Sequence, residues 1–213
     1  MKKGILFDLD GTLWDSTIPV ADSWNVVIEE ETGEADKLTP EDIMGEMGRT
    51  MTQIADDLFD FLPEKERYEL AHKCEVFEND YIKEHGAKLF PDVIKTLEML
   101  LAAGEKMAVV SNCQEGYVSA FIESMQLDKY FCDYEEWGRT GLSKAGNISL
   151  VMERNGEDKA VYVGDIQRDA DSAHEAGVPC IWAKYGFGHI DDAEEEIESF
   201  DELPEALRQI GYL

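Results

Sequence analysis

The sequence predicts an α/β fold, in which a doubly wound, Rossmann-like parallel sheet carries a small helical domain. The first observation is a set of short apolar runs, each of which ends at a polar residue and is followed by a loop and a helix-like stretch. These runs occupy residues 4–8, 107–111 and 160–165, with a further one at 179–183. Apolar runs without polar alternation are typical of strands that helices cover on both faces.

The second observation is that helix-like stretches separate these runs. Residues 93–103 and 169–176 are followed by Gly104 and Gly177, and glycine is the residue type that most often ends a helix. Residues 116–125 form a third such stretch. Because strands and helices alternate along the chain, the strands are expected to form a parallel sheet.

The third observation is the long segment between the first two apolar runs, which exceeds what a single crossover helix requires. Apolar residues recur in this segment at helical spacing, first at Val20, Trp24, Val27 and Ile28. We therefore predict two domains, an α/β core of residues 1–15 and 85–213 and an all-helical cap of residues 16–84.

Composition limits the possible partners of the chain. Of its 213 residues 44% are apolar, enough for a sizeable core. The 47 Asp and Glu outnumber the 19 Lys and Arg, and the net charge of -28 disfavours nucleic acid and anionic membranes as partners. An anionic substrate would also be repelled, so a site for one needs a bound metal ion or a few placed cations. The acidic stretch 191–198 is predicted to be a solvated helix face.

Two further features concern the location of the protein. Its four cysteines lack the short spacings of zinc sites and redox dithiols, so they are expected to be reduced. The first apolar run is interrupted by Asp8, so no signal peptide is predicted. No stretch approaches the roughly 18 apolar residues of a membrane span. We therefore expect a cytoplasmic protein.

Asp8 and Asp10 are two residues apart at the end of the first apolar run. Side chains at positions i and i+2 of a strand project to the same side, so the two carboxylates share a small space. Two negative charges at such a short distance repel each other unless a cation or a proton offsets the repulsion. The pair therefore indicates a metal ion or an acid/base pair. A polar strand end followed by an Asp-Gly turn explains the same residues without any function.

Polar residues also follow two other apolar runs. Ser111 and Asn112 end the second run, whereas Asp165 ends the third and Asp169 opens the helix after it. Ligands in open α/β sheets lie at this edge. Simpler explanations exist for each residue taken alone, because Asp169 suits a helix N-terminus and Ser111 a helix N-cap. Lys144, further along the chain, could likewise be an exposed lysine in the first turn of a helix.

Together, an acidic pair, a hydroxyl, a lysine and a second acidic pair follow one another along the chain, and each strand-borne member ends an apolar run. This pattern resembles the haloacid dehalogenase superfamily, and within it the phosphatases similar to phosphoglycolate phosphatase, with a helical cap inserted between the first two motifs. The resemblance covers nearly the whole chain. Asp10 separates the chain from the dehalogenases themselves, which resemble D-x-Y at this place and need no magnesium.

The resemblance implies a Mg²⁺-dependent phosphatase that hydrolyses a small phosphorylated metabolite through an aspartyl-phosphate intermediate. The roles it implies are nucleophile for Asp8, general acid/base for Asp10, phosphate binding for Thr12, Ser111, Asn112 and Lys144, and the metal site for Asp8, Asp10, Asp165 and Asp169. A phosphomutase acting on a sugar phosphate and a non-catalytic, phosphate-binding regulatory protein stay open as alternatives. Neither the leaving group nor the oligomeric state follows from the sequence.

Arg49 lies between Gly48 and Thr50 in a segment of the predicted cap that is rich in acids. One explanation is an exposed arginine that forms surface ion pairs. The other is that the neighbouring glycine lets the loop approach the mouth of the site, where a guanidinium could bind a carboxylate or hydroxyl of the leaving group. Arg49 is therefore the candidate residue for substrate specificity.

Overall fold

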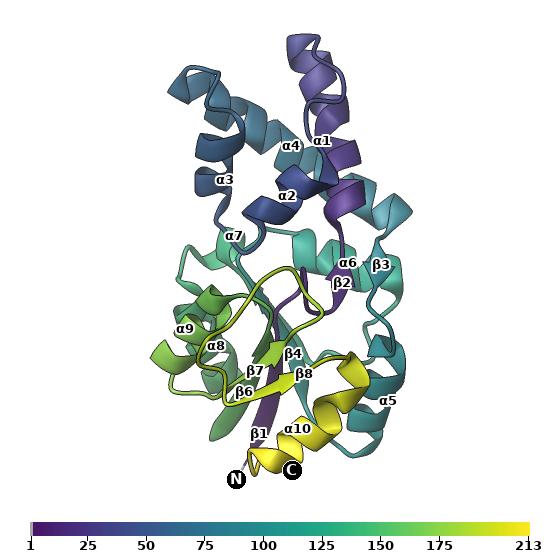
Figure 1. Ribbon diagram of the computed structural model, residues 1–213, viewed down its shortest axis with the longest axis vertical. Coiled ribbons are helices and arrows are strands. Elements are labelled where there is room, and N and C mark those ends of the chain that lie inside the picture. Colours follow the sequence, from purple (N-terminus) through teal and green to yellow (C-terminus); the bar gives the residue numbers. More distant parts are fainter. Residues whose placement is uncertain (1) are drawn as a thin grey trace.

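The computed structural model describes residues 2–213 and contains a six-stranded parallel sheet with the strand order β5-β4-β1-β6-β7-β8 (Figure 1). Its strands are β1 (Lys3–Phe7), β4 (Met107–Ser111), β5 (Asp133–Glu136), β6 (Lys159–Gly164), β7 (Cys180–Ala183) and β8 (Glu195–Ile197). Four of these strands coincide with the four apolar runs. The predicted α/β fold class is confirmed.

Helices cover both faces of the sheet because the central strands are apolar on both sides. Ile5 and Phe7 of β1 belong to one apolar core, whereas Leu6 between them belongs to the other. The first core includes residues of α5 (Val93–Ala102), α6 (Tyr117–Met125) and α10 (Leu203–Gln209). The second core includes residues of α8 (Lys144–Asn155) and α9 (Gln167–Glu175). Alternate residues of one strand therefore hold both helical layers.

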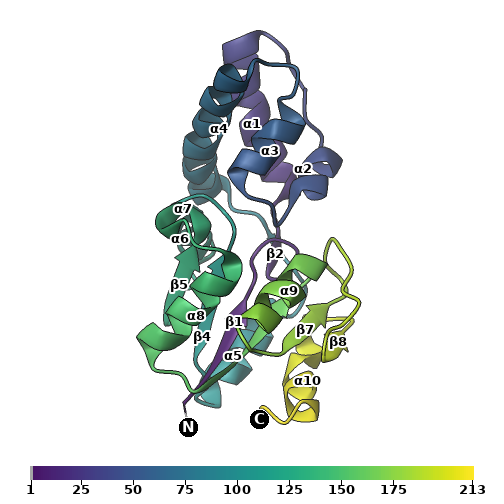
Figure 2. The ribbon, with the colours of Figure 1, turned by 90° about the vertical axis from the view of Figure 1, so that its left-hand side faces the viewer.

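The segment between β1 and β4 contains four helices that extend beyond the carboxyl ends of the strands (Figures 1 and 2). We call these helices the helical insert: α1 (Thr17–Thr32), α2 (Pro40–Glu46), α3 (Met51–Leu58) and α4 (Glu64–His85). Two short antiparallel strands, β2 (Trp14–Asp15) and β3 (Lys88–Leu89), join the insert to the rest of the chain. The helical character expected for this segment is observed, and its division from the core at residues 16 and 84 stays a prediction.

The helical insert has an apolar interior of its own. Trp24 of α1 stacks on Phe59 at a ring-centroid distance of 5.8 Å, and both side chains are buried. Val20, Val27 and Ile28, which share the helical spacing of Trp24, are buried too. Burial of these side chains favours packing of the helices against one another.

The acidic stretch 191–198 is not a helix, and this prediction was wrong. Glu195–Ile197 forms β8, an edge strand parallel to β7. Ile197 is buried beside Ala183, while Glu196 is exposed, so side chains alternate between the protein and solvent. Charge alone does not distinguish a solvated helix face from an edge strand, because both expose acids to water.

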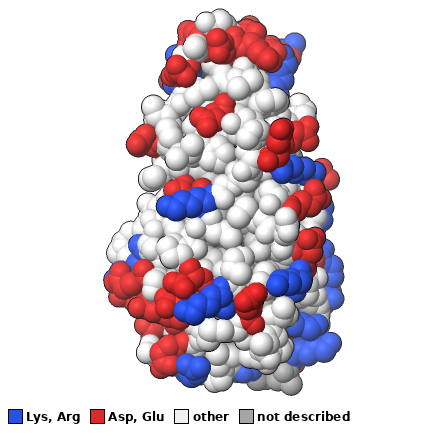
Figure 3. All heavy atoms as spheres, turned by 90° about the vertical axis from the view of Figure 1, so that its right-hand side faces the viewer, with Lys and Arg blue, Asp and Glu red and all other residues white. Residues whose placement is uncertain are grey.

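The face shown in Figure 3 carries side chains of both charge signs between broad uncharged areas, and acidic side chains gather at the end farthest from the sheet. Two short elements complete the fold, the helix α7 (Trp137–Thr140) and the 3₁₀ turn Phe200–Glu202. In the part of the chain that the structure describes, none of the helices has the length and apolar character needed to span a membrane.

Candidate active site

Three neighbouring strands bring polar side chains to one edge of the sheet. Asp8 follows β1, Ser111 ends β4 and Asp165 follows β6, and β1 lies between β4 and β6. All three residues are buried. In a parallel sheet the carboxyl ends of the strands lie at the same edge, which is where ligands bind in open α/β folds.

A cluster of three buried carboxylates forms the centre of the site. Oxygen atoms of Asp8, Asp165 and Asp169 lie within 4.8 Å of one another. Burial and the charge of Asp169 raise the pKa of Asp8 to about 7, although Lys144 opposes the rise. Burial, Asp169 and Asp8 also raise the pKa of Asp165 well above its usual range. Carboxylate oxygens crowded in this way are suited to a hard divalent cation such as Mg²⁺, which would offset their repulsion.

Lys144, the first residue of α8, is the cation of the cluster. Its Nζ lies 2.9 Å from Asp8 Oδ1 and 2.5 Å from Asp169 Oδ1, and the residue is only 3% exposed. Burial disfavours the charged ammonium, but the two carboxylates outweigh burial and raise the pKa of Lys144. The alternative of an exposed lysine is therefore wrong.

Asp169 supports the cluster through both of its oxygens. Oδ1 accepts the bond from Lys144, while Oδ2 accepts hydrogen bonds from the backbone N–H groups of Asp165 and Ile166 at 3.1 and 3.2 Å. Asp169 therefore stabilises the start of α9 and positions Lys144 at the same time. Both descriptions considered from the sequence, the helix-terminal acid and the member of an acidic cluster, apply to this residue.

Two glycines let the backbone approach Asp165 closely. A Cβ atom on Gly11, which has φ +84°, would lie 2.1 Å from Asp165 Oδ2, and one on Gly186 would lie 2.3 Å from Asp165 Cβ. The backbone N–H of Phe187 donates to Asp165 Oδ2 at 2.7 Å. Sequence reasoning missed the loop that contains Gly186 and Phe187, although this glycine-rich segment directly follows the predicted strand 179–183.

Asp10 lies beside the cluster and is held by three donors on one oxygen. Its Oδ1 accepts hydrogen bonds from Trp14 Nε1 at 2.8 Å, Ser16 Oγ at 2.5 Å and Tyr117 Oη at 3.0 Å. Burial raises the pKa of Asp10, and these hydrogen bonds oppose the rise. The side chain is therefore fixed in one orientation. Trp14, Ser16 and Tyr117 were not identified from the sequence.

The remaining predicted phosphate ligands lie at the same edge of the sheet. Asn112 Nδ2 donates to the carbonyl oxygen of Gly48 at 3.0 Å, which links the loop after β4 to the helical insert. Thr12 is buried, and its hydroxyl has no hydrogen-bond partner within residues 2–213. A buried hydroxyl without a partner costs free energy unless a ligand satisfies it.

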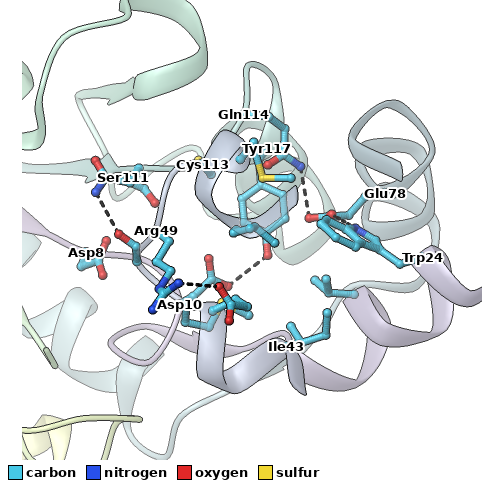
Figure 4. A pocket seen from close by; sticks show the side chains of 17 residues that line it. Asp8, Asp10, Trp24, Ile43, Arg49, Glu78, Ser111, Cys113, Gln114 and Tyr117 are labelled. Carbon is cyan, nitrogen blue, oxygen red and sulfur yellow. Dashed lines mark hydrogen bonds and ion pairs between the residues drawn. The ribbon is translucent and has the colours of Figure 1, made fainter. Parts of the chain in front are cut away.

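A cavity separates the sheet edge from the helical insert (Figure 4). It contains about 550 Å³ of space that no atom fills, part of it open to solvent, and we call it the cavity beneath the insert. The core contributes Asp8, Asp10, Ser111, Asn112, Cys113, Gln114 and Tyr117 to its walls. The insert contributes Val20, Trp24, Ile43, Glu46, Met47, Gly48, Arg49, Met51, Ile54 and Glu78.

Arg49 borders this cavity and forms ion pairs within the insert. Its guanidinium contacts Asp57 and lies 3.3 Å from Glu46 Oε2, and its side chain is 37% exposed. The preceding Gly48 has φ +76°, and a Cβ atom there would lie 2.3 Å from Ile166 Cδ1. The loop therefore approaches the sheet edge closely, the ion pairs of Arg49 match the explanation of a surface arginine, and contact between Arg49 and a leaving group stays a prediction.

Comparison with known proteins identifies the family of this chain. The family model described as haloacid dehalogenase-like hydrolase matches residues 5–183. The chain belongs to the haloacid dehalogenase-like hydrolase family. The resemblance recognised in the sequence is confirmed, and so is the prediction of a hydrolase of this family.

Named relatives of this hydrolase include phosphoglycolate phosphatases. Those of Escherichia coli (strain K12) and Salmonella typhimurium are each 28% identical to it, over 96% of this chain and 92% of theirs. Among solved structures, a predicted phosphoglycolate phosphatase from Haemophilus somnus is similar with a TM-score of 0.82 at 23% identity, covering 96% of this chain and 97% of that one. A predicted phosphatase from Clostridium acetobutylicum gives 0.80 at 22%, covering 98% and 99%.

Proposed function

We propose that this member of the haloacid dehalogenase-like hydrolase family is a Mg²⁺-dependent phosphatase that hydrolyses a small phosphorylated metabolite in the cytoplasm through an aspartyl-phosphate on Asp8. The observation that carries the proposal is the position of Asp8. Its carboxylate accepts a hydrogen bond from the buried Lys144 and lies beside the carboxylates of Asp165 and Asp169. The phosphatase names of the curated relatives support the same reaction class.

The metal site in this proposal consists of Asp8, Asp165 and the main-chain carbonyl of Asp10, with Asp169 as the supporting acid. The crowded, buried carboxylates fit a divalent cation, since their mutual repulsion disfavours three charges without one. Bound Mg²⁺ would supply positive charge that lets an anionic nucleophile approach an anionic phosphate.

In the first half-reaction, a carboxylate oxygen of Asp8 attacks phosphorus, and the bond from phosphorus to the ester oxygen breaks. Asp10 donates its proton to the departing alkoxide, so a neutral alcohol leaves. In the second half-reaction, Asp10 takes a proton from water as the water oxygen attacks phosphorus. Inorganic phosphate leaves, and the carboxylate of Asp8 and the proton on Asp10 are both restored.

Lys144 and the polar groups around it bind the phosphate oxygens in this proposal. The ammonium of Lys144 provides the permanent positive charge, and the side chains of Ser111, Thr12 and Asn112 lie at the same edge of the sheet as donors. The unpartnered hydroxyl of Thr12 supports this role, because a phosphate oxygen would satisfy it. The helical insert closes the opposite side of the site and limits access of water.

The test is release of phosphate from a generic aryl phosphate, with Mg²⁺ and with excess chelator. We expect turnover only with Mg²⁺, and we expect Asp8→Asn to lower kcat by at least about 10³-fold, because the amide keeps the shape but not the nucleophilic charge. Asp171→Asn on α9 is the control, since Asp171 is exposed. Turnover of Asp8→Asn close to that of the wild type would refute the covalent mechanism.

A further inference from the structure

The walls of the cavity beneath the insert are mainly apolar on the side away from Asp8. Val20 and Trp24 of α1, Ile43 of α2, and Met47 and Met51 around the following loop face this space. A leaving group that extends from the phosphate toward the insert would therefore meet aliphatic, thioether and aromatic surface. Such walls favour apolar groups and disfavour a charge that has no partner.

Arg49 does not provide an uncompensated positive charge to this space. Of the cavity-lining residues in the described part of the chain, it alone is basic. Its guanidinium contacts Asp57 and lies near Glu46, and burial raises the pKa of Glu46 while Arg49 lowers it. Two acids therefore already compete for the one cation, and an incoming carboxylate would have to displace them.

The far end of the cavity contains a buried carboxyl group. Glu78 of α4 accepts hydrogen bonds from Trp24 Nε1 and, at 3.1 Å, from Gln114 Nε2. It lies away from Asp8, and Arg49 lies between them in the view of Figure 4. Burial raises the pKa of Glu78 to about 8, so this end is uncharged near neutral pH. An uncharged carboxyl group can hydrogen-bond a hydroxyl, whereas it repels an anion once it ionises.

We infer that the alcohol released by this enzyme is neutral and mainly apolar, with a hydroxyl or similar polar group as its only hydrogen-bonding feature, and that a carboxylate-bearing leaving group such as glycolate is disfavoured. The inference rests on the proposed phosphatase function. Its basis is the combination of apolar walls, a compensated Arg49 and a far end where the buried Glu78 provides a hydrogen-bonding group but no positive charge. It distinguishes this chain from the relatives named phosphoglycolate phosphatase.

A size-matched pair of esters tests the inference on the wild-type enzyme. 2-Phosphoglycolate carries a carboxylate, whereas 2-hydroxyethyl phosphate replaces it with a neutral hydroxymethyl group. With Mg²⁺ present, we expect kcat/KM to be at least about tenfold higher for 2-hydroxyethyl phosphate. Equal values, or a preference for 2-phosphoglycolate, would overturn the inference.

A matched pair of variants tests whether compensation of Arg49 causes the discrimination. Asp57→Asn removes one partner of Arg49, whereas Asp56→Asn makes the same change of charge at a neighbouring residue that pairs with Arg67. We expect Asp57→Asn to raise kcat/KM for 2-phosphoglycolate about threefold or more and to leave 2-hydroxyethyl phosphate unchanged. Asp56→Asn should change neither. An equal gain in both variants would attribute the effect to net charge and contradict the role of Arg49.

The aryl phosphate separates failure of this inference from failure of the proposed function. Turnover of the aryl phosphate together with a preference for 2-phosphoglycolate would refute the inference alone. No turnover of any ester with Mg²⁺ would refute the phosphatase function. Calorimetry of Asp8→Asn with both small esters then reports the selectivity of the cavity directly, and stronger binding of 2-phosphoglycolate would refute the inference without any turnover.

Discussion

At the scale of single residues, the site combines ionisable groups that would each be unfavourable alone. Lys144 is buried, yet it stays charged because Asp8 and Asp169 surround its ammonium group. Removal of one partner from a buried ion pair typically costs about 3–5 kcal/mol, because the remaining charge is left without compensation. These residues are therefore interdependent, and the effects of their substitutions should not be additive.

Glu78 gives a residue-scale prediction about pH. Its pKa is about 8 in the folded protein and near its usual 4.5 in the unfolded chain. Between these values the folded state holds a proton that the unfolded state has released, so this group's contribution to stability is complete below pH 4.5 and is lost as the pH rises to about 8. Glu78→Gln removes the contribution, and the melting temperature of the variant relative to the wild type should rise from pH 5 to pH 8 and level off above.

Melting curves at a series of pH values measure this effect. The titratable groups that surround Glu78 are Asp10, Cys74, Glu75 and Tyr117, and all four remain in the variant. They therefore contribute in both proteins, and the difference between the two curves isolates Glu78. If the two curves run parallel from pH 5 to pH 8, Glu78 keeps an ordinary pKa and the far end of the cavity is charged at neutral pH.

At the scale of elements, the loop between α2 and α3 connects the insert to the sheet edge. The carbonyl oxygen of Gly48 accepts hydrogen bonds from Asn112 at 3.0 Å and from Arg168 at 2.9 Å. Asn112 lies in the loop after β4, whereas Arg168 lies in the first turn of α9, the helix that follows β6. A single backbone group therefore fixes the insert against both sides of the site.

Gly48→Ala tests this connection. The alanine Cβ would lie 2.3 Å from Ile166 Cδ1 and the backbone is left-handed at φ +76°, so we expect a loss of about 1–2 kcal/mol in unfolding free energy. We also expect a lower kcat/KM. Gly45→Ala in α2 is the matched control, because a Cβ there has no neighbour within 4 Å, and alanine in a helix stabilises by up to about 1 kcal/mol. Equal effects of both substitutions on denaturant unfolding and on kcat/KM would contradict the close approach at Gly48.

At the scale of the whole molecule, the acidic cluster predicts that Mg²⁺ stabilises the fold. The chain has a net charge of -28, and its three buried carboxylates repel one another at the sheet edge. A ligand that binds only the folded state raises the free energy of unfolding by about 2.7 kcal/mol when its concentration is 100 times its Kd. We therefore expect Mg²⁺ to raise the melting temperature more than NaCl of the same ionic strength does.

Two variants separate the site from general charge screening. Asp165→Asn should abolish the specific response to Mg²⁺, whereas Asp171→Asn on the exposed face of α9 should retain it. Each of the two substitutions replaces one carboxyl group with an amide of the same shape. A response that survives in Asp165→Asn, or that NaCl reproduces, would show that Mg²⁺ acts on the acidic surface and not at the cluster.

Four strands of the sheet, and the edge at which the candidate residues lie, were predicted from the sequence. The runs 4–8, 107–111, 160–165 and 179–183 are apolar because helices cover both faces of these strands, and this signal is local in the chain. The sequence did not predict β5 or β8, because these two strands are rich in acidic residues and contain no apolar run. In β5, Glu135 is buried because Arg139 and Arg154 pair with it, and these partners are recognised only in the folded chain.

The arrangement of the candidate residues in space could not be predicted from the sequence. Asp8 and Lys144 are 136 positions apart in the chain, and nothing near Lys144 in the sequence indicates that its ammonium group is buried. The same holds for Glu78. Its position in the sequence is typical of an exposed acid on a helix, but in the folded chain it is buried and accepts hydrogen bonds from Trp24 and Gln114. Burial and charge compensation depend on groups that folding brings together from distant segments, whereas strand and helix patterns depend on neighbouring residues.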